Sequence, residues 1–260
     1  MAPSVTEVLY AIGAGDQIVG VTRYCYYPPE VENKTRIGGY YDPDYEKLLS
    51  LQPDLVVLLP EHEAVRGYLE KLHLPYLTVN HRNIAGILES IEILGKQTGC
   101  VPRAEALSKN IRERLDALRT HLKNLPPKNV LVSVGRELGT GGLQTVFAAG
   151  GGSFHGELIE LAGGKNVCEK FKNYPILARE GLLQVNPEVI LDLIPDAAEK
   201  KMDDASLLKE WGTFPELRAV ATHQVFIFRE NFTVIPGPRF VDIIEKMACV
   251  LHPEVFETTA

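Results

Sequence analysis

The residues best suited to bind a ligand are aromatic side chains, which gather in segments rich in turn-forming residues. Five tyrosines fall between positions 24 and 41, and more rings follow in the second half of the chain: Tyr24, Tyr26, Tyr27, Tyr40, Tyr41, Phe147, Phe154, Tyr174 and Phe232. Each ring offers a flat apolar face, and tyrosine adds a polar tip. Some of these rings should pack the loops themselves, but together they indicate a large, flat, partly apolar ligand.

Two glutamates at matching places in the chain form a second group of candidates. The stretch Tyr40–Leu59 aligns without a gap on Tyr174–Leu193, at an offset of 134 positions (from Tyr40 to Tyr174). Glu46 then falls on Glu180, and each lies in the first turn of a predicted short helix. A carboxylate there stabilises its helix by about 0.3–1 kcal/mol through the helix dipole. A matched pair would also suit a two-armed protein partner, and both interpretations stay open.

Two arginines are the cationic candidates for the same ligand. Arg136 follows a predicted strand, and Arg239 precedes the last predicted helix. Either guanidinium could pair with a carboxylate or phosphate group. Arg239 could equally pair with residues of the hinge.

Patterns for catalysis are weak. The Gly-rich segment near position 150 lacks the lysine of a phosphate-binding loop, and the four cysteines contain no CxxC pair. We therefore predict a protein that is not an enzyme, with no catalytic residues, no metal ligands and no intrinsic cofactor. The alternative is a chelatase-like or metallocluster-processing enzyme on a two-lobed scaffold, which would require Cys25, Cys168 and His155 to meet at a metal.

The elements that would position these residues alternate between strands and helices. The continuous apolar run Leu55–Leu59, bounded by prolines, is typical of a parallel strand covered on both faces, and the repeat predicts a second such strand at Val189–Leu193. Further strands are predicted at 18–21, 76–79, 130–134 and 225–228, and helices at 5–12, 45–51, 63–72, 84–96, 154–162 and 240–251. This alternation implies right-handed crossovers and parallel sheets.

A long helix is predicted in the middle of the chain. Apolar residues recur at spacings of three and four through residues 101–125, and Pro126-Pro127 ends the pattern. With the repeat on either side, this predicts an α/β fold of two similar Rossmann-like lobes with parallel sheets, joined by one long rigid backbone helix. The expected parts are an N-terminal lobe (1–100), the bridging helix (101–126), a C-terminal lobe (127–235) and a C-terminal helix returning to the N-terminal lobe (236–260).

The first residues of the chain predict a helix start. Ser4 and Glu7 have the spacing of a capping box, in which each side chain accepts a hydrogen bond from the other residue's amide. They are not preceded by the charged region and the apolar core that a signal peptide has. We expect the signal segment, and any lipid anchor, to lie outside this chain.

Several segments together resemble one known family. They are "VGVTRYCYYPPEV", "IGGYYDPDYEKLLSLQPDLVVL", "GELIELAGGKNV", "YPILAREGLLQVNPEVIL" and "PGPRFVDIIEKMACVLHPE". In colinear order they are similar to the periplasmic substrate-binding proteins of iron-siderophore, haem and cobalamin ABC importers, most of all to the cobalamin-binding branch. The resemblance implies two α/β lobes on a rigid helix, with cobalamin or another metal chelate held between the lobes and delivered to a membrane permease.

The resemblance also implies roles for individual residues. Tyr24, Tyr40 and Tyr174 match positions that contact the corrin ring, whereas Glu46 and Glu180 match carboxylates that dock on permease arginines. The other predicted ligand-binding residues are Tyr41, Phe147, Asn231 and Phe232. A departure at Ile235, where the cobalamin branch has an arginine, leaves haem and ferric siderophores open as ligands.

Composition and charge limit the partners. The net charge is −7 and no basic stripe is present, so we expect no nucleic acid partner. No apolar run approaches the length of a membrane span, so the chain itself should not insert into a bilayer. The resemblance to the substrate-binding proteins implies a periplasmic or otherwise extracytoplasmic location.

Overall fold

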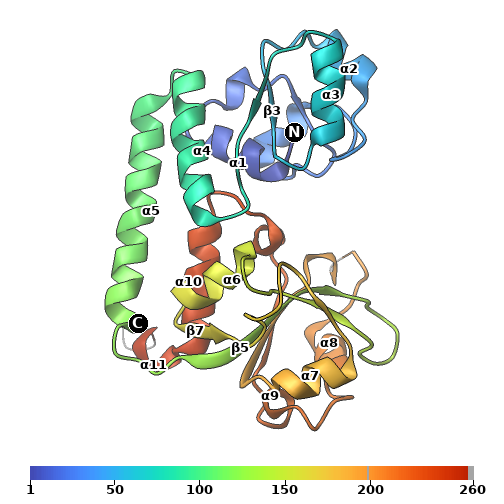
Figure 1. Cartoon of the computed structure of the whole chain (residues 1–260), viewed down its shortest axis with the longest axis vertical. Helices are drawn as coiled ribbons and strands as arrows, with labels where there is room; N and C mark the ends of the chain where they lie inside the picture. Colours follow the sequence, from blue (N-terminus) through green and yellow to red (C-terminus); the bar gives the residue numbers. More distant parts are fainter. Residues whose placement is uncertain (198, 257–260) are drawn as a thin grey trace. The chain divides into compact units, whose positions relative to one another are not determined.

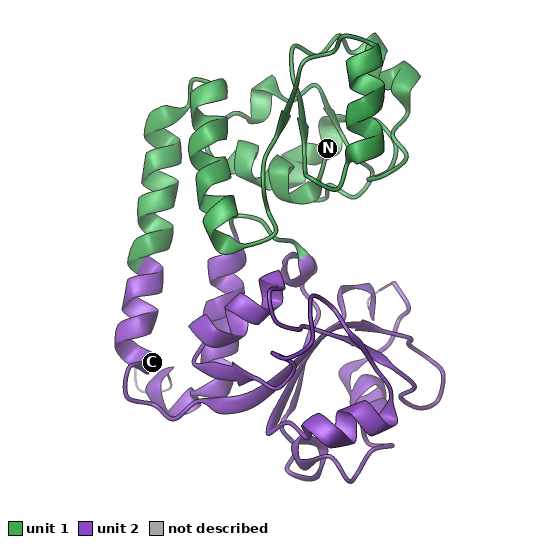
Figure 2. Ribbon diagram, in the orientation of Figure 1, with its two compact units in different colours: residues 1–113, 235–238 green, residues 114–234, 239–260 purple. Residues whose placement is uncertain are grey.

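The computed structural model describes residues 1–197 and 199–256, which form two compact units. Unit 1 holds Met1–Glu113 and Ile235–Pro238, and unit 2 holds Arg114–Val234 and the described residues from Arg239 onward (Figure 2). Helix α5 (Val101–Leu122) crosses the boundary between them as one continuous element (Figure 1). The long helix is therefore present, although it ends three residues before the predicted end at position 125.

Unit 1 is built from short parallel strands with helices between them. Its main elements are α1 (Pro3–Ala11), β1 (Gly20–Val21), β2 (Thr35–Arg36), α2 (Tyr45–Ser50), β3 (Val56–Leu58), α3 (Glu63–Lys71), β4 (Tyr76–Thr78) and α4 (Ile84–Gln97). Strand β1 pairs with β2, and β3 pairs with β4, both in parallel. Helix α4 buries Ile87, Ile91 and Leu94 completely and packs against α1.

The start of α1 differs from the predicted capping box. The helix begins at Pro3, so Ala2 is the N-cap and Ser4 lies inside the first turn. Proline is favoured at this first position because its fixed φ suits a helix and no partner for its missing N–H is needed. The Ser4 hydroxyl lies instead 2.8 Å from Nδ1 of His81, whose Nε2 is 2.7 Å from Ser90 Oγ. The hydroxyl thus joins a buried network between α1 and α4.

Three buried histidines make the folded protein sensitive to acid. Burial lowers the pKa of His62, His81 and His155 from 6.5 to about 4. Because the folded state disfavours the protonated rings, their contribution to stability is complete above pH 6.5 and is lost as the pH falls toward 4. We expect the free energy of unfolding to drop between pH 7 and pH 5 by on the order of 2 kcal/mol for each ring.

Chemical denaturation at the two pH values measures this drop. The variant His81→Gln should start from a lower stability at pH 7 but lose about 2 kcal/mol less on acidification. An equal loss in the variant and the parent protein would show that His81 does not contribute to the pH dependence.

Unit 2 contains a larger sheet. Its elements are β5 (Lys128–Arg136), β6 (Val146–Ala148), α6 (Phe154–Leu161), β7 (Gly164–Asn166), β8 (Ile176–Leu177), α7 (Arg179–Val185), β9 (Val189–Leu193), α8 (Asp204–Trp211), α9 (Arg218–Ala221), β10 (Val225–Phe228), α10 (Phe240–Leu251) and α11 (Pro253–Phe256). The strand order is β10-β9-β5-β6-β8, and β7 also pairs with β5. Every residue of the interior strand β9 is buried, as expected for a parallel strand covered on both faces, although Asp192 interrupts its apolar sequence.

Two features of unit 2 differ from the sequence-based expectation. Strand β6 runs antiparallel to both β5 and β8, so this sheet is mixed rather than wholly parallel. The C-terminal helix α10 packs on α6 and belongs to unit 2, rather than returning to the N-terminal lobe. Ion pairs reinforce that placement, because Arg114 lies 2.5 Å from both Asp242 and Glu245 of α10. The two-lobed α/β prediction is confirmed, while these details are corrected.

Candidate functional site

The predicted aromatic residues of unit 1 lie on two neighbouring loops. Tyr24 follows β1, and Tyr40 and Tyr41 precede α2. Arg23 joins the loops, since its Nη2 donates to Asp42 Oδ2 at 2.6 Å while its guanidinium lies 5.6 Å from the centre of the Tyr24 ring. Large parts of Tyr24 and Tyr41 are exposed to solvent.

Tyr40 is held in place by residues that follow β3. Its hydroxyl donates to Glu61 Oε1 at 2.6 Å. Its ring lies 4.4 Å from the ring of His62 and meets Tyr41 edge-on at 4.8 Å, measured between centroids. Burial and the Glu61 carboxylate raise the pKa of the Tyr40 phenol, which is therefore neutral at pH 7. The half-buried Tyr40 thus supports the exposed ring of Tyr41.

In unit 2, one buried histidine connects two of the predicted segments. His155, in the first turn of α6, has Nδ1 3.1 Å from the Tyr174 hydroxyl and Nε2 2.8 Å from the Thr233 carbonyl oxygen. Thr233 lies in the single turn of 3-10 helix η4 (Asn231–Val234), which also carries Asn231 and Phe232. His155 therefore fixes Tyr174 and the η4 turn relative to each other.

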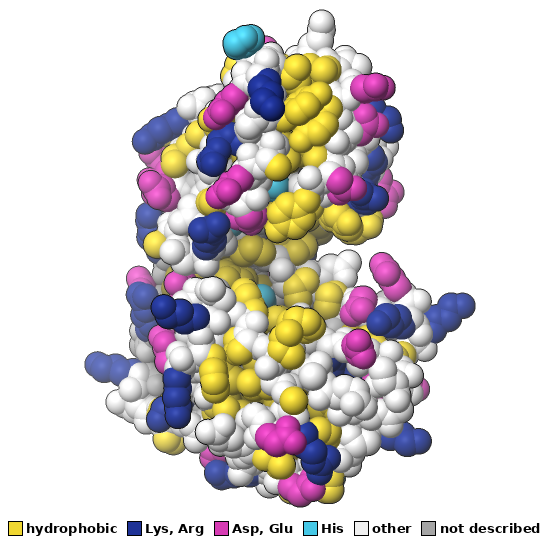
Figure 3. All heavy atoms as spheres, turned by 45° about the vertical axis from the view of Figure 1, so that its right-hand side comes forward, with side chains coloured by type: hydrophobic (Ala, Val, Ile, Leu, Met, Phe, Trp, Pro, Cys, Tyr) yellow, Lys and Arg dark blue, Asp and Glu magenta, His cyan; other side chains and the backbone are white. Residues whose placement is uncertain are grey.

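The remaining predicted ring of unit 2 lies on the sheet edge. Phe147, in the middle of β6, pairs with Ile176 of β8, two residues after Tyr174. Phe147, Tyr174 and Ile176 are all exposed. At η4, the guanidinium of Arg239 lies 4.9 Å from the centre of the Phe232 ring. Figure 3 shows hydrophobic side chains, in yellow, gathered on the surface of each unit.

Sequence reasoning missed the residues that support these rings. Glu61 carries no motif, and the pair His62-Glu63, which lacks the second histidine of an HExxH motif, predicts a solvated helix surface. That prediction is wrong for His62, which is buried beside Tyr40. For His155 the sequence offers only a metal contact or a surface role, and the side chain is buried. The only sequence signal for them is position, because Glu61 follows a predicted strand and His155 opens a predicted helix. Their bonds to Tyr40 and Tyr174 span 21 and 19 positions and leave no local pattern.

Arg136 does not lie at the site. Its side chain is fully buried, with Nε 2.9 Å from Asp192 Oδ2 and an ion pair to Glu210. The indole Nε1 of Trp211 donates to the same Asp192 oxygen at 2.8 Å. The hypothesis that Arg136 pairs with a ligand is therefore wrong, because its guanidinium is occupied in the core of unit 2.

The two glutamates lie at equivalent places in the two units. Glu46 is exposed in the first turn of α2, which leads to β3, and Glu180 is exposed in the first turn of α7, which leads to β9. The repeat along the sequence thus corresponds to a repeated short helix and parallel strand. Both carboxylates can stabilise their helices through the dipole.

The enzyme alternative requires Cys25, Cys168 and His155 to meet at a metal, and the described part of the chain does not meet this requirement. Residues 1–197 and 199–256 contain no group of three His, Cys, Asp or Glu side chains that could hold a metal ion. Cys25 is buried with its Sγ 3.3 Å from the hydroxyls of Thr6 and Thr22. Burial raises the pKa of Cys168 to about 11, which disfavours the thiolate that a metal needs.

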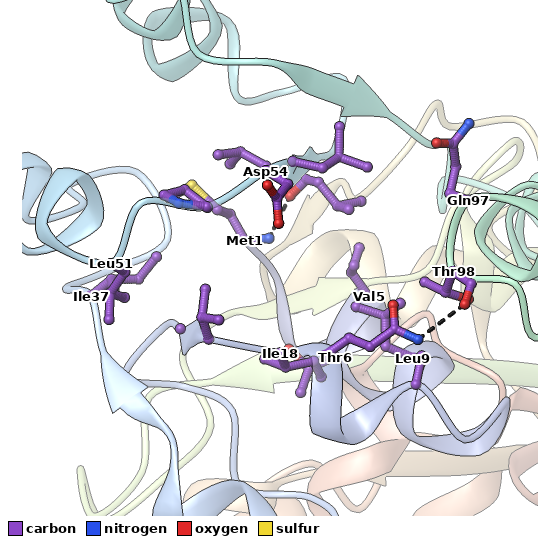
Figure 4. A pocket seen from close by; sticks show the side chains of 18 of the residues that line it. Met1, Val5, Thr6, Leu9, Ile18, Ile37, Leu51, Asp54, Gln97 and Thr98 are labelled. Atoms are coloured by element: carbon purple, nitrogen blue, oxygen red, sulfur yellow. Dashed lines mark hydrogen bonds between the residues drawn. The ribbon is translucent and has the colours of Figure 1, made fainter.

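Unit 1 also contains a groove of about 520 Å³ between β1 and β3 (Figure 4). Side chains of α1 and α4 line it, together with Leu55, Val56 and Val57 around β3. At one end the amino group of Met1 donates to the Val57 carbonyl oxygen at 2.5 Å. The predicted ligand-binding residues do not line this groove, so it is separate from the aromatic loops.

The fold and the aromatic loops define a two-unit α/β binding protein, and comparison with known proteins gives its family. The profile of the periplasmic binding protein family matches residues 1–231, so the chain belongs to that family. The ABC transporter substrate-binding lipoprotein YvrC of Bacillus subtilis is 26% identical over 268 residues, which cover 99% of this chain and 80% of YvrC. The resemblance seen in the sequence is confirmed.

Two solved structures are similar over almost the whole chain. The periplasmic vitamin B12 binding protein BtuF of Vibrio cholerae has a TM-score of 0.81 at 25% identity, covering 97% of this chain and 95% of BtuF. The periplasmic heme-binding protein RhuT of Roseiflexus sp. RS-1 has a TM-score of 0.82 at 22% identity, covering 98% and 97%. The likeness to RhuT shows the shared fold alone. Among the described residues, no helix is long and apolar enough to cross a membrane.

Proposed function

We propose that this chain is the substrate-binding component of an ABC importer and that it captures cobalamin or a related metal tetrapyrrole. One observation carries the proposal: Tyr40 and Tyr174, which the internal repeat aligns, are each fixed by a hydrogen bond next to exposed rings. Fixed aromatic faces suit a large flat macrocycle, because little side-chain entropy is lost on binding. The vitamin B12-binding relative supports the corrin as the ligand.

Equilibrium dialysis tests this function and separates it from the enzyme alternative. The protein is dialysed against cyanocobalamin, haem or a ferric siderophore, and the ligand is then recovered and analysed. We expect cyanocobalamin to be retained at one molecule per chain and recovered unchanged. Retention of haem or the siderophore alone would reject the corrin, and a chemically altered ligand would favour an enzyme.

The proposed partner of the loaded protein is the membrane permease of the importer. Glu46 and Glu180 are exposed at equivalent helix starts, and carboxylates there can pair bidentately with arginines of a partner. As a member of the periplasmic binding protein family, the chain would meet the permease from outside the cytoplasm, and the lipoprotein relative suggests a lipid anchor as its means of attachment.

Charge reversal tests this docking role. The double variant Glu46→Lys/Glu180→Lys should lose uptake of the ligand in cells, because like charges would face the permease arginines. Its affinity for the ligand in solution should stay within about threefold of the parent protein, since both glutamates are exposed on the helices that follow the aromatic loops. Glu63→Lys, at the start of α3, is the matched control and should support normal uptake. Normal uptake by the double variant would leave both glutamates with only their helix-stabilising role.

A further inference from the structure

The hydrogen bonds of Tyr40 and Tyr174 show where their hydroxyl protons point. A carbonyl oxygen only accepts, so His155 must donate from Nε2–H to Thr233. The ring is neutral at pH 7, because burial lowers its pKa to about 4. Nδ1 is then an acceptor, and the Tyr174 hydroxyl 3.1 Å away donates to it.

The same polarity holds at Tyr40 in unit 1. The ionised Glu61 carboxylate can only accept, so the Tyr40 hydroxyl donates its proton to Oε1 at 2.6 Å. Both tyrosines therefore give their only hydroxyl proton to the protein. Neither hydroxyl then has a proton left to donate to a ligand.

The charged residues beside the rings of unit 1 also disfavour a carboxylate on the ligand. Arg23 is paired with Asp42 at 2.6 Å, and Arg82 lies 3.8 Å from the second oxygen of Glu61. The cations next to Tyr24 and Tyr40 are thus matched by carboxylates of the protein. A carboxylate on the ligand would meet proton-accepting oxygens and the negative charge of Glu61 at this place.

We propose that Glu61 in unit 1 and His155 in unit 2 are positioning residues that make the aromatic loops of each unit favour tetrapyrroles with neutral carboxamide edges over those with carboxylate edges. A carboxamide N–H can donate to the phenol oxygens of Tyr40 and Tyr174, whereas a carboxylate has no proton to donate. A site of this polarity rejects the wrong group strongly, because the mismatch leaves polar atoms unpaired. This inference rests on the proposed function, and it names the class of ligand that the site takes.

Matched ligands test the proposal. Binding of cyanocobalamin is compared with binding of its monocarboxylic acids, in which one side-chain amide has been hydrolysed, at pH 7.5. We expect at least one acid to bind about 10-fold more weakly or worse. Consider an acid whose carboxylate faces Tyr174. Tyr174→Phe and His155→Phe should each bring its dissociation constant to within about threefold of that of cyanocobalamin. The first variant removes the phenol oxygen, and the second frees the hydroxyl proton.

Variants at Glu61 test whether the discrimination in unit 1 depends on the hydrogen bond that Glu61 accepts from Tyr40 or on the negative charge of Glu61. Glu61→Gln keeps an oxygen that accepts from Tyr40 and should retain most of the discrimination, whereas Glu61→Leu should lose it. Circular dichroism first confirms that each variant is folded. Equal binding of all the acids and the parent amide would overturn the inference, as would tighter binding of haem, which carries carboxylates, than of cyanocobalamin. Failure to bind any tetrapyrrole would instead reject the proposed function.

Discussion

Replacing Tyr40 and Tyr174 together by alanine is expected to weaken cobalamin binding by about 2–6 kcal/mol, or roughly 30-fold to 10⁴-fold. Each ring at the centre of a binding surface contributes about 1–3 kcal/mol when removed. The two losses should add, because the rings belong to separate units and Tyr40 bonds to Glu61 whereas Tyr174 bonds to His155. Titration calorimetry of the single and double variants measures the sum.

Two controls accompany this result, the melting temperature of the variants and the removal of a tyrosine outside the predicted site. Tyr40 and Tyr174 are both partly exposed, so their loss should leave the melting temperature close to that of the parent protein. Tyr26→Ala removes an exposed tyrosine of the Tyr24 loop that has no assigned role, and its affinity should change by less than about threefold. A double variant that binds as tightly as the parent protein would remove both rings from the site.

Replacing Arg136 by methionine should cost unit 2 about 3–5 kcal/mol of stability. The change leaves Asp192 and Glu210 buried without their cation, although Asp192 keeps its bond from the Trp211 indole. Burial already raises the pKa of Asp192 with the arginine present, so without Arg136 the carboxyl should become protonated near neutral pH. Urea denaturation at pH 7 measures the loss.

An exposed ion pair is the control for Arg136. Arg119 lies 3.0 Å from Asp116 on the surface of α5, and Arg119→Met should change the free energy of unfolding by less than about 1 kcal/mol. The folded Arg136→Met protein should still bind its ligand, because Arg136 is enclosed in the core. A loss of affinity without a loss of stability would return Arg136 to the ligand site.

The sequence predicts the regular elements well where they carry a long or unbroken pattern. The spacing of apolar residues predicts α5, and the alignment of Val189–Leu191 on the apolar run that begins at Leu55 predicts β9; both elements are present. The strands β6 and β8 are only three and two residues long, so no pattern could show them or their antiparallel direction. The apolar face of α10 predicts that the helix is covered, but not that α6 covers it.

The candidate site divides in the same way. The residue types that suit a flat ligand are visible as clusters of tyrosine and phenylalanine in predicted loops, whereas the partners that orient them are not. The bond from His155 to Thr233 spans 78 positions, and it depends on how α6 and η4 fold together. Arg136 shows the opposite error, since an arginine after a strand looks available until its buried partners are known.

Calorimetric titration of the purified chain with cyanocobalamin, beside haem and a ferric siderophore, tests the central claim most directly. The claim that this periplasmic binding protein carries a corrin for an importer predicts sub-micromolar, one-to-one binding of cyanocobalamin, on the order of −8 kcal/mol or stronger. Binding of haem or the siderophore alone would contradict the corrin and keep a binding protein of the same family. Absence of binding to all three would contradict the claim that the aromatic loops take a metal chelate.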